Sequence, residues 1–333
     1  MSNIVESDFM KHCIYFVLSL FFIACQPNNL QKEINLQIDP SIKVSNTIPS
    51  LIVLGNVQDA GSPHAACKKE CCKDLFINPD PTRKVVSLGL IDPIDSSTYL
   101  FEATPDMTSQ MKHLTKIGNN NNEVPNAIFL THAHIGHYTG LMYLGKEAMN
   151  ANGVNVYAMP RMASYLTNNG PWSQLVDNNN ISLVPIASDS AIQLNQALQV
   201  IPFKVPHRDE YSETIGYKII GPNKSALFIP DIDKWSKWEK NIIEEVKQID
   251  YAFIDATFYD GAEINNRDIS EIPHPFIVET MALFKDVPTN EKNKIYFIHL
   301  NHTNPGLDAG SDQKKTILES GFHIAEYGHV FGM

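Results

Sequence analysis

Short apolar runs recur along the chain, and each ends in polar or turn-forming residues. Runs of this length that are rich in β-branched and aromatic residues are typical of buried β-strands. They predict strands at 51–57, 85–92, 97–104, 126–132, 154–159, 181–186, 198–205, 214–220, 225–231, 251–257 and 294–300. Apolar positions at helical spacing predict helices at 107–118, 139–153, 238–249 and 274–287.

The order of these elements indicates the fold class. Strands and helices alternate toward both ends of the pattern, and a run of strands occupies its middle. We therefore expect an α/β sandwich in which helices cover packed sheets. Residues 50–333 contain no repeat of short period and no internal linker, so we expect a single domain there.

The first 49 residues do not follow this pattern. An apolar stretch that is short for a membrane span ends in a small residue and then Cys25. It resembles a bacterial lipoprotein signal, in which the cysteine becomes the lipidated N-terminus. We expect a signal peptide over 1–25, with Met10 as the true start, and a flexible tether over 26–49. An uncleaved membrane anchor is the alternative. In both cases the protein would be exported, and a lipid on Cys25 would tether it to the cell envelope.

Composition narrows the classes of partner. The formal net charge is −11 at pH 7 and no basic run is present, so we expect no nucleic-acid partner. Only 19% of the residues are charged, which argues against a disordered or coiled-coil chain. A small-molecule substrate is the expected partner.

Three histidines lie close together after the predicted strand 126–132. His132 and His134 are two residues apart, so both side chains point the same way from an extended segment. His137 falls at the start of the loop or helix that follows. Imidazole coordinates zinc and also suits iron or manganese. Three imidazoles at the carboxyl end of a strand predict a metal centre more strongly than a cluster of surface histidines.

Further ligands should come from distant segments. His207, Asp231 and His299 each end or closely follow a predicted strand. For any one of them alone, a capping residue or a solvated loop would be the simpler interpretation. Their repeated placement after apolar strands favours a shared metal centre.

The order of these motifs resembles the metallo-β-lactamase superfamily, whose signature is His-x-His-x-Asp-His followed by His, Asp and His. Here "HAHIGH" begins at His132, and His207, Asp231 and His299 follow. The resemblance covers about residues 50–333 and implies a four-layer αβ/βα sandwich. The stretches "HLNHTNPGL" and "QDAGSPHAACKKECC" are similar to the branch that contains the pyrroloquinoline quinone biosynthesis protein B.

The resemblance also implies ligand roles. One ion would be held by His132, His134 and His207, a second by His137 and His299, and Asp231 would bridge the two. The ions would lie about 3.5–4 Å apart and would activate a bridging water or hydroxide. We expect one or two divalent ions, with zinc first and iron or manganese as alternatives.

Gly136 stands where the superfamily has an aspartate ligand. Its presence removes one negative charge, so the second ion should be held weakly or be absent unless another carboxylate replaces it. Asp59 is the preferred substitute and Asp255 the alternative. A third alternative is that an anionic substrate supplies the charge. Glycine also permits a different loop path.

The cysteines suggest a second metal site. Outside the cytoplasm a disulfide is the default, yet the adjacent Cys71 and Cys72 would pair only with strain. His64, Cys67, Cys71 and Cys72 would instead make a four-ligand structural zinc site. One disulfide with a free thiol remains the alternative.

Other residues near these motifs have expected supporting roles. His274, at the start of a predicted helix, is a candidate substrate contact or proton donor, with packing near the cap as the alternative. We expect Asn301 and Asn304 to orient His299, and His302 to point away from it as a structural residue. The stretch 168–175 is expected to form a pocket-edge loop with Trp172 exposed, and Glu102 and Asp106 to support the metal ligands.

Three functions follow. The first is a metal-dependent hydrolase in which metal-bound water or hydroxide, with Asp231 and His274 as catalytic residues, attacks an ester, phosphodiester or related bond. The second, which the branch resemblance allows, is an iron-dependent oxidative enzyme. The third is a non-catalytic, lipid-anchored metal-binding protein, which the missing aspartate keeps open.

Overall fold

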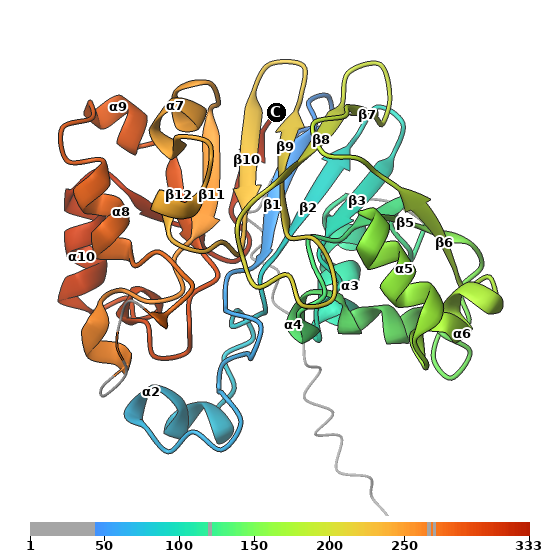
Figure 1. Cartoon of the computed structure of the whole chain (residues 1–333), viewed down its shortest axis with the longest axis horizontal. Coiled ribbons are helices and arrows are strands. Elements are labelled where there is room, and N and C mark those ends of the chain that lie inside the picture. The colour runs from blue at the N-terminus through green and yellow to red at the C-terminus, as the bar shows by residue number, and fades with distance from the viewer. Residues whose placement is uncertain (1–43, 119–121, 265–267, 269–270) are drawn as a thin grey trace, which may run out of the picture. The chain divides into compact units, whose positions relative to one another are not determined.

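The structure is a computed structural model that describes residues 44–118, 122–264, 268 and 271–333. It contains two seven-stranded sheets (Figure 1). The first sheet has the order β14 (Val330–Gly332), β1 (Ser50–Gly55), β2 (Ser87–Asp92), β3 (Ser97–Phe101), β4 (Ala127–Phe129), β5 (Val154–Ala158) and β6 (Ile181–Pro185). The second has the order β13 (His323–Ile324), β12 (Ile295–Ile298), β11 (Tyr251–Asp255), β10 (Ser225–Ile229), β9 (Ile215–Ile220), β8 (Gln199–Lys204) and β7 (Ile192–Gln193).

The two sheets are built alike. In the first, β14, β1, β2 and β3 pair antiparallel, and β3 to β6 pair parallel. In the second, β7 to β10 pair antiparallel, and β10 to β13 pair parallel. The carboxyl ends of parallel strands are where α/β proteins place their sites, and the candidate ligands follow β4, β10 and β12.

The apolar runs are uninterrupted because most strands are buried on both faces. In β1, Leu51 and Val53 face the core between the sheets, whereas Ile52 and Leu54 face the helices on the outside. Large aromatic side chains fill the core between the sheets, among them Phe101, Phe129, Tyr217, Phe228 and Phe253.

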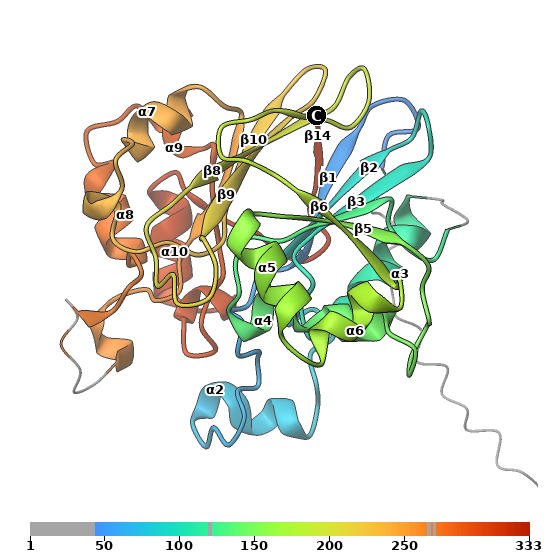
Figure 2. The ribbon, with the colours of Figure 1, turned by 45° about the vertical axis from the view of Figure 1, so that its right-hand side comes forward.

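Helices cover the outer face of each sheet (Figure 2). α3 (Met107–Ile117), α5 (Pro160–Asn168) and α6 (Trp172–Asp177) pack on the first sheet, and α7 (Ile242–Lys247), α8 (Ile277–Leu283) and α10 (Asp312–Glu319) pack on the second. The shorter helices are α2 (Glu70–Lys73), α4 (Ile135–Tyr138) and α9 (Thr289–Lys292), and short 3₁₀ segments include η1 (Asp74–Phe76), η2 (Thr139–Leu144), η3 (Trp235–Lys237), η4 (Gly261–Ile264) and η6 (Pro305–Leu307). The expected four-layer αβ/βα sandwich is confirmed.

The structure differs from the sequence prediction on either side of β5. Of the expected helix 139–153 only η2 forms, directly after α4. Gly140 lies against the backbone that precedes α3: a Cβ there would lie 2.2 Å from the Thr104 carbonyl oxygen. After β5, the structure has two helices that were not expected, α5 and α6, and α6 occupies much of the expected loop 168–175. Trp172 is therefore half-buried against the outer core rather than exposed.

The expected signal peptide falls outside the described residues, as does most of the expected tether. Val44, at the end of the predicted tether, already packs against the helices of the first sheet. In the described part of the chain, no helix combines the length and the apolar character needed to cross a membrane.

Candidate metal centre

The predicted ligands from distant segments meet around Asp231, which follows β10. Asp231 Oδ2 lies 3.3 Å from His132 Nε2 and 3.2 Å from His207 Nε2. The same oxygen lies 3.8 Å from His134 Nδ1 and 3.9 Å from His137 Nε2. A carboxylate in contact with four imidazoles from two distant segments has the position expected of a bridging ligand.

Several buried polar atoms at this point make no contact with hydrogen-bond geometry among the described residues, although some lie close to other ligand atoms. They are His137 Nε2, both ring nitrogens of His207, Asp231 Oδ1 and His299 Nε2. Leaving such atoms unpaired costs roughly 1–3 kcal/mol each, so native proteins rarely gather them in one place. Imidazole nitrogens and carboxylate oxygens are the donors that zinc, iron and manganese take, so the residues present fit a metal ion.

The ligand atoms at this centre fall into three overlapping groups, within each of which they lie within 4.8 Å of one another. One group contains His132, His134, His207 and Asp231, as predicted for the first ion. A group around the inner carboxylates contains Asp231, Asp255, His274 and His299. The second group of predicted ligands contains Asp59, His137 and His299. The second group contains the residues predicted for the second ion, including the preferred substitute for the missing aspartate.

Gly136 is glycine because Asp59 takes the space beside it. A Cβ added at Gly136 would lie 2.1 Å from Asp59 Cβ and 2.5 Å from both Asp59 Cα and the Asp59 carbonyl oxygen. No side chain fits at that separation unless the backbone moves. The loop after β1 therefore brings a carboxylate to the position from which residue 136 would otherwise present one.

Asp255, the alternative substitute, is already hydrogen-bonded on both oxygens. Oδ1 accepts the N–H of Thr257 at 2.9 Å and its hydroxyl at 2.7 Å. Oδ2 accepts the N–H of Ile232 at 3.1 Å and faces His274 Nδ1 at 2.9 Å. Asp255 is therefore suited to positioning its neighbours, and Asp59 is the better candidate for the metal.

His274 lies between two carboxylates. Its Nδ1 is 2.9 Å from Asp255 Oδ2 and 3.2 Å from Asp231 Oδ1. Burial lowers the pKa of His274, but the charges of Asp255 and Asp231 raise it, to about 10. Because Nδ1 faces these carboxylates, Nε2 is the ring nitrogen left for a substrate.

Glu102 orients His137 from behind. Its Oε2 is 3.1 Å from His137 Nδ1, and its Oε1 accepts the Thr131 N–H at 3.1 Å. Glu102 is fully buried and has φ +77°, a conformation that an L-residue keeps only when its surroundings hold it. Asp106, which directly precedes α3, does not share this role, because its carboxylate accepts the N–H of Val85.

Sequence reasoning missed Glu210. Its Oε2 lies 3.1 Å from His134 Nε2, so Nδ1 of the same ring is turned toward Asp231. A carboxylate on the far nitrogen of a ligating histidine fixes the ring and strengthens it as a ligand. The only sequence signal was its position three residues after His207.

His299 is oriented by Thr257, which the sequence also did not reveal. The Thr257 hydroxyl lies 2.8 Å from His299 Nδ1, and His299 has φ +63°. Asn301 and Asn304, expected to orient His299, hydrogen-bond to the backbone of Thr257, the residue that contacts the His299 ring. Asn304 Nδ2 donates to the Thr257 carbonyl at 3.2 Å, and the Asn301 N–H donates to the same carbonyl at 2.9 Å.

The cysteines form a second candidate metal group, with a change in its fourth member. The ligand atoms of Cys67, Cys71, Cys72 and His302 lie within 4.8 Å of one another, and all three thiols are free. His64, the expected fourth ligand, instead stacks on His302 with ring centroids 4.6 Å apart. His302 could not be identified as the fourth ligand from the sequence, because it comes close to the cysteines only when the segment after β12 folds against the loop that carries them.

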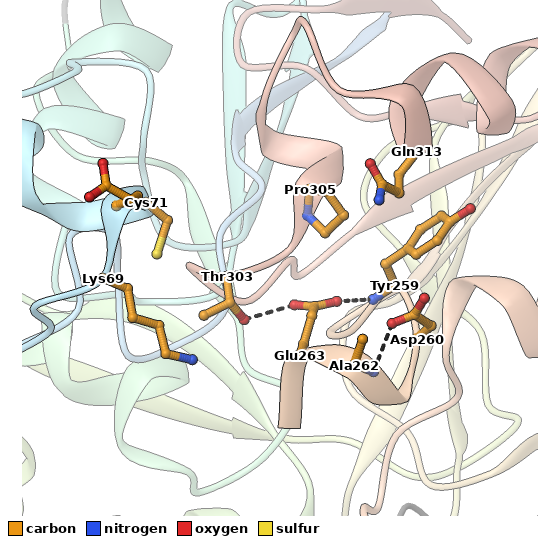
Figure 3. Close-up of a pocket in the computed structure, with 10 residues that line it drawn as sticks. Lys69, Cys71, Tyr259, Asp260, Ala262, Glu263, Thr303, Pro305 and Gln313 are labelled. Atoms are coloured by element: carbon orange, nitrogen blue, oxygen red, sulfur yellow. Dashed lines mark hydrogen bonds between the residues drawn. The ribbon is translucent and has the colours of Figure 1, made fainter. Parts of the chain in front are cut away.

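A pocket of about 490 Å³ lies beside this group (Figure 3). Cys71 and Lys69 line one side, and η4 lines the other. Thr303 donates its hydroxyl to Glu263 at 2.7 Å across the floor between them. The Cys71 thiol is therefore accessible to small reagents from this pocket.

Comparisons with known proteins agree with this architecture. Residues 97–300 match the family model for the β-lactamase superfamily domain. The coenzyme PQQ synthesis protein B of Xanthomonas axonopodis pv. citri is 25% identical over 305 residues, which cover 84% of this chain and 98% of that relative. The protein of the same name from Gluconobacter oxydans is 23% identical over 304 residues, which cover 84% of this chain and 97% of that relative.

Solved structures show the same fold. The Zn²⁺-bound PqqB from Methylobacterium extorquens gives a TM-score of 0.69 at 18% identity, over 85% of this chain and all of that one. A diphosphatase of the PhnP family gives a TM-score of 0.60 at 21% identity, over 86% of this chain and 97% of that one.

Proposed function

Because the chain belongs to the β-lactamase superfamily, we propose that it is a metal-dependent hydrolase that acts on an ester, phosphodiester or related bond of a small molecule. The observation that carries this proposal is the set of unpaired buried imidazole and carboxylate atoms around Asp231. Divalent ions held there would act as Lewis acids and lower the pKa of a water ligand toward about 7.

The chain's own residues would supply the remaining chemistry. Asp231, whose Oδ2 lies 3.2 Å from His207 Nε2 and 3.9 Å from His137 Nε2, would hold the two ligand sets together and balance positive charge. His274, supported by Asp255, would place a ring N–H next to the reacting group and deliver a proton to the leaving atom. Glu102, Glu210 and Thr257 would keep the ligating rings in position, as their hydrogen bonds indicate.

Replacement of His134 by alanine tests this proposal against a non-catalytic metal-binding protein. The substrates would be 4-nitrophenyl acetate and bis(4-nitrophenyl) phosphate, with zinc, manganese or iron supplied in turn. We expect turnover of at least one substrate and a loss of at least about 100-fold in His134→Ala. The matched control is His329→Ala, which removes an exposed histidine outside the centre and should leave turnover unchanged. Tight metal binding without turnover of either substrate would favour the binding protein.

An iron-dependent oxidative role is the second candidate. What supports it is the match to coenzyme PQQ synthesis proteins over 84% of this chain. Oxygen consumption by the iron-loaded protein, with no hydrolysis under zinc, would favour it. Export would argue against it if synthesis of the coenzyme starts in the cytoplasm.

We further propose a structural zinc ion at Cys67, Cys71, Cys72 and His302, supported by their closeness. Burial and the neighbouring Cys67 raise the pKa of the Cys72 thiol to about 12, so a bound cation would be needed to hold it as thiolate.

We also propose that the protein is exported and lipid-anchored through Cys25, as the sequence predicts. Detergent-phase partitioning of the native protein, lost in Cys25→Ala, would support this anchor.

A further inference from the structure

A cavity of about 320 Å³ lies between η2 with the turn after it and helix α6. None of the metal-centre residues lines it. Its walls are largely apolar, and they include Met142, Ala148, Pro171, Trp172 and Leu175. Cavities of about 300–1,000 Å³ with such walls and a few polar groups are typical sites for small molecules, so this one suits a compact ligand.

The cavity is also lined by a buried amide whose oxygen lacks a hydrogen-bond donor among the described residues. Asn180 is only 1% exposed, and its Nδ2 donates to the Ala151 carbonyl at 2.9 Å and to Asn150 Oδ1 at 3.3 Å. Its Oδ1 has no hydrogen-bond donor among the residues that the structure describes. A buried acceptor left unpaired costs roughly 1–3 kcal/mol, and a ligand donor would recover that energy.

The main aromatic wall is already fixed in place. The Trp172 ring packs edge-on against Tyr138 with centroids 5.0 Å apart, and the Tyr138 hydroxyl lies 2.8 Å from that of Tyr165. Tyr138 in turn directly follows His137 in α4. A wall held by such contacts need not rearrange to receive a flat ring, which lowers the cost of binding.

The rim limits the charge of the ligand. Lys146 and Glu147 both line the cavity and carry opposite charges, so neither an anion nor a cation is favoured overall. Met142, in the cavity wall, is 54% exposed, and Met149, outside the cavity, is 41% exposed, so the apolar surface extends beyond the cavity. Exposed methionines on this scale are common at adaptable binding surfaces.

We propose that this cavity is a binding site for a small, neutral aromatic molecule that carries one N–H or O–H donor. The ring packs against Trp172 and Pro171, and the donor reaches Asn180 Oδ1. The site is separate from the metal centre, and its occupancy does not depend on the hydrolase proposal.

Isothermal titration with indole, and with 1-methylindole as the matched probe without a donor, tests the site. We expect saturable binding of one indole per chain and about tenfold weaker binding of 1-methylindole, the equivalent of one hydrogen bond of about 1.4 kcal/mol. Ala148→Trp should fill the cavity and abolish binding. Ala191→Trp, at an exposed alanine that does not line the cavity, should retain it.

Two further variants keep the test decisive. If Ala148→Trp does not fold by circular dichroism, Ala148→Leu takes its place and should weaken binding. His134→Ala should bind indole as the wild type does, because the probe does not enter the metal centre. Absence of saturable binding, equal binding in the filled variant, or loss of binding in His134→Ala would overturn the proposal.

Discussion

Asp59→Asn tests how the chain makes up for the missing aspartate in "HAHIGH". Asparagine keeps the size of the side chain and removes its charge. The ligand atoms of Asp59, His137 and His299 lie within 4.8 Å of one another, so the substitution takes one negative charge from a site for a dication. Loss of an outer-shell partner alone costs roughly 10–100-fold in metal affinity, so we expect at least that loss, or about 1.4–2.7 kcal/mol, for the second ion.

The assay is metal content by elemental analysis after equilibration against a graded chelator. Wild-type protein should retain a second ion in the main centre to higher chelator concentrations than Asp59→Asn, whereas the first ion, at His132, His134 and His207, should be nearly unaffected. Asp286→Asn, at an exposed position outside the site, is the matched control. Equal retention of the second ion in wild type and Asp59→Asn would refute the assignment of Asp59.

Restoring the aspartate should not rescue the site. In Gly136→Asp the new Cβ would start 2.1 Å from Asp59 Cβ, so the loop after β1 must move. Overpacking of this kind costs typically about 1–3 kcal/mol, and we expect a lower melting temperature together with weaker second-ion binding. Adding Asp59→Gly should recover part of both. A fully stable Gly136→Asp protein with undiminished metal binding would show that the contact is not limiting.

Three other predictions concern groups around the main site and beyond it. Glu210→Gln should weaken the first ion by roughly 10–100-fold without unfolding the protein, as measured by the same chelator series. Burial, with a smaller effect from Lys116, lowers the pKa of His113 to about 4, so the folded protein binds fewer protons than the unfolded chain between about pH 6.5 and 4. Stability should therefore fall as pH drops through that window, by about 2–3 kcal/mol, and urea unfolding of His113→Phe should show a smaller fall by that amount. Cys71→Ser should release the ion of the cysteine group, and chelation of the wild type should make its thiols reactive toward a disulfide reagent; thiols that react equally before and after chelation would contradict this.

The main ligands could be predicted because each follows an apolar strand. His132, His134, His207, Asp231 and His299 all lie where a strand ends, and the sandwich brings those strand ends together. The spacing within "HAHIGH" and the strand pattern were therefore sufficient for the centre and for the layered fold. They were not sufficient for helices α5 and α6, whose short amphipathic stretches lie within a run of predicted strands.

The supporting residues depend on contacts between segments that sequence patterns do not record. Glu210 and Thr257 are ordinary loop residues until the fold turns them toward His134 and His299. The replacement of His64 by His302 in the cysteine group depends on the path of the segment after β12. The fit of Asp59 against Gly136 depends on a backbone approach of a few ångströms.

Two metal ions are expected to share Asp231, with Asp59 in the place of the missing ligand. Anomalous diffraction from crystals grown with zinc tests it most directly. We expect two peaks flanking Asp231, one bound by His132, His134 and His207, the other by Asp59, His137 and His299. Peaks absent from this centre, or a second peak that Asp59 does not reach, would contradict it.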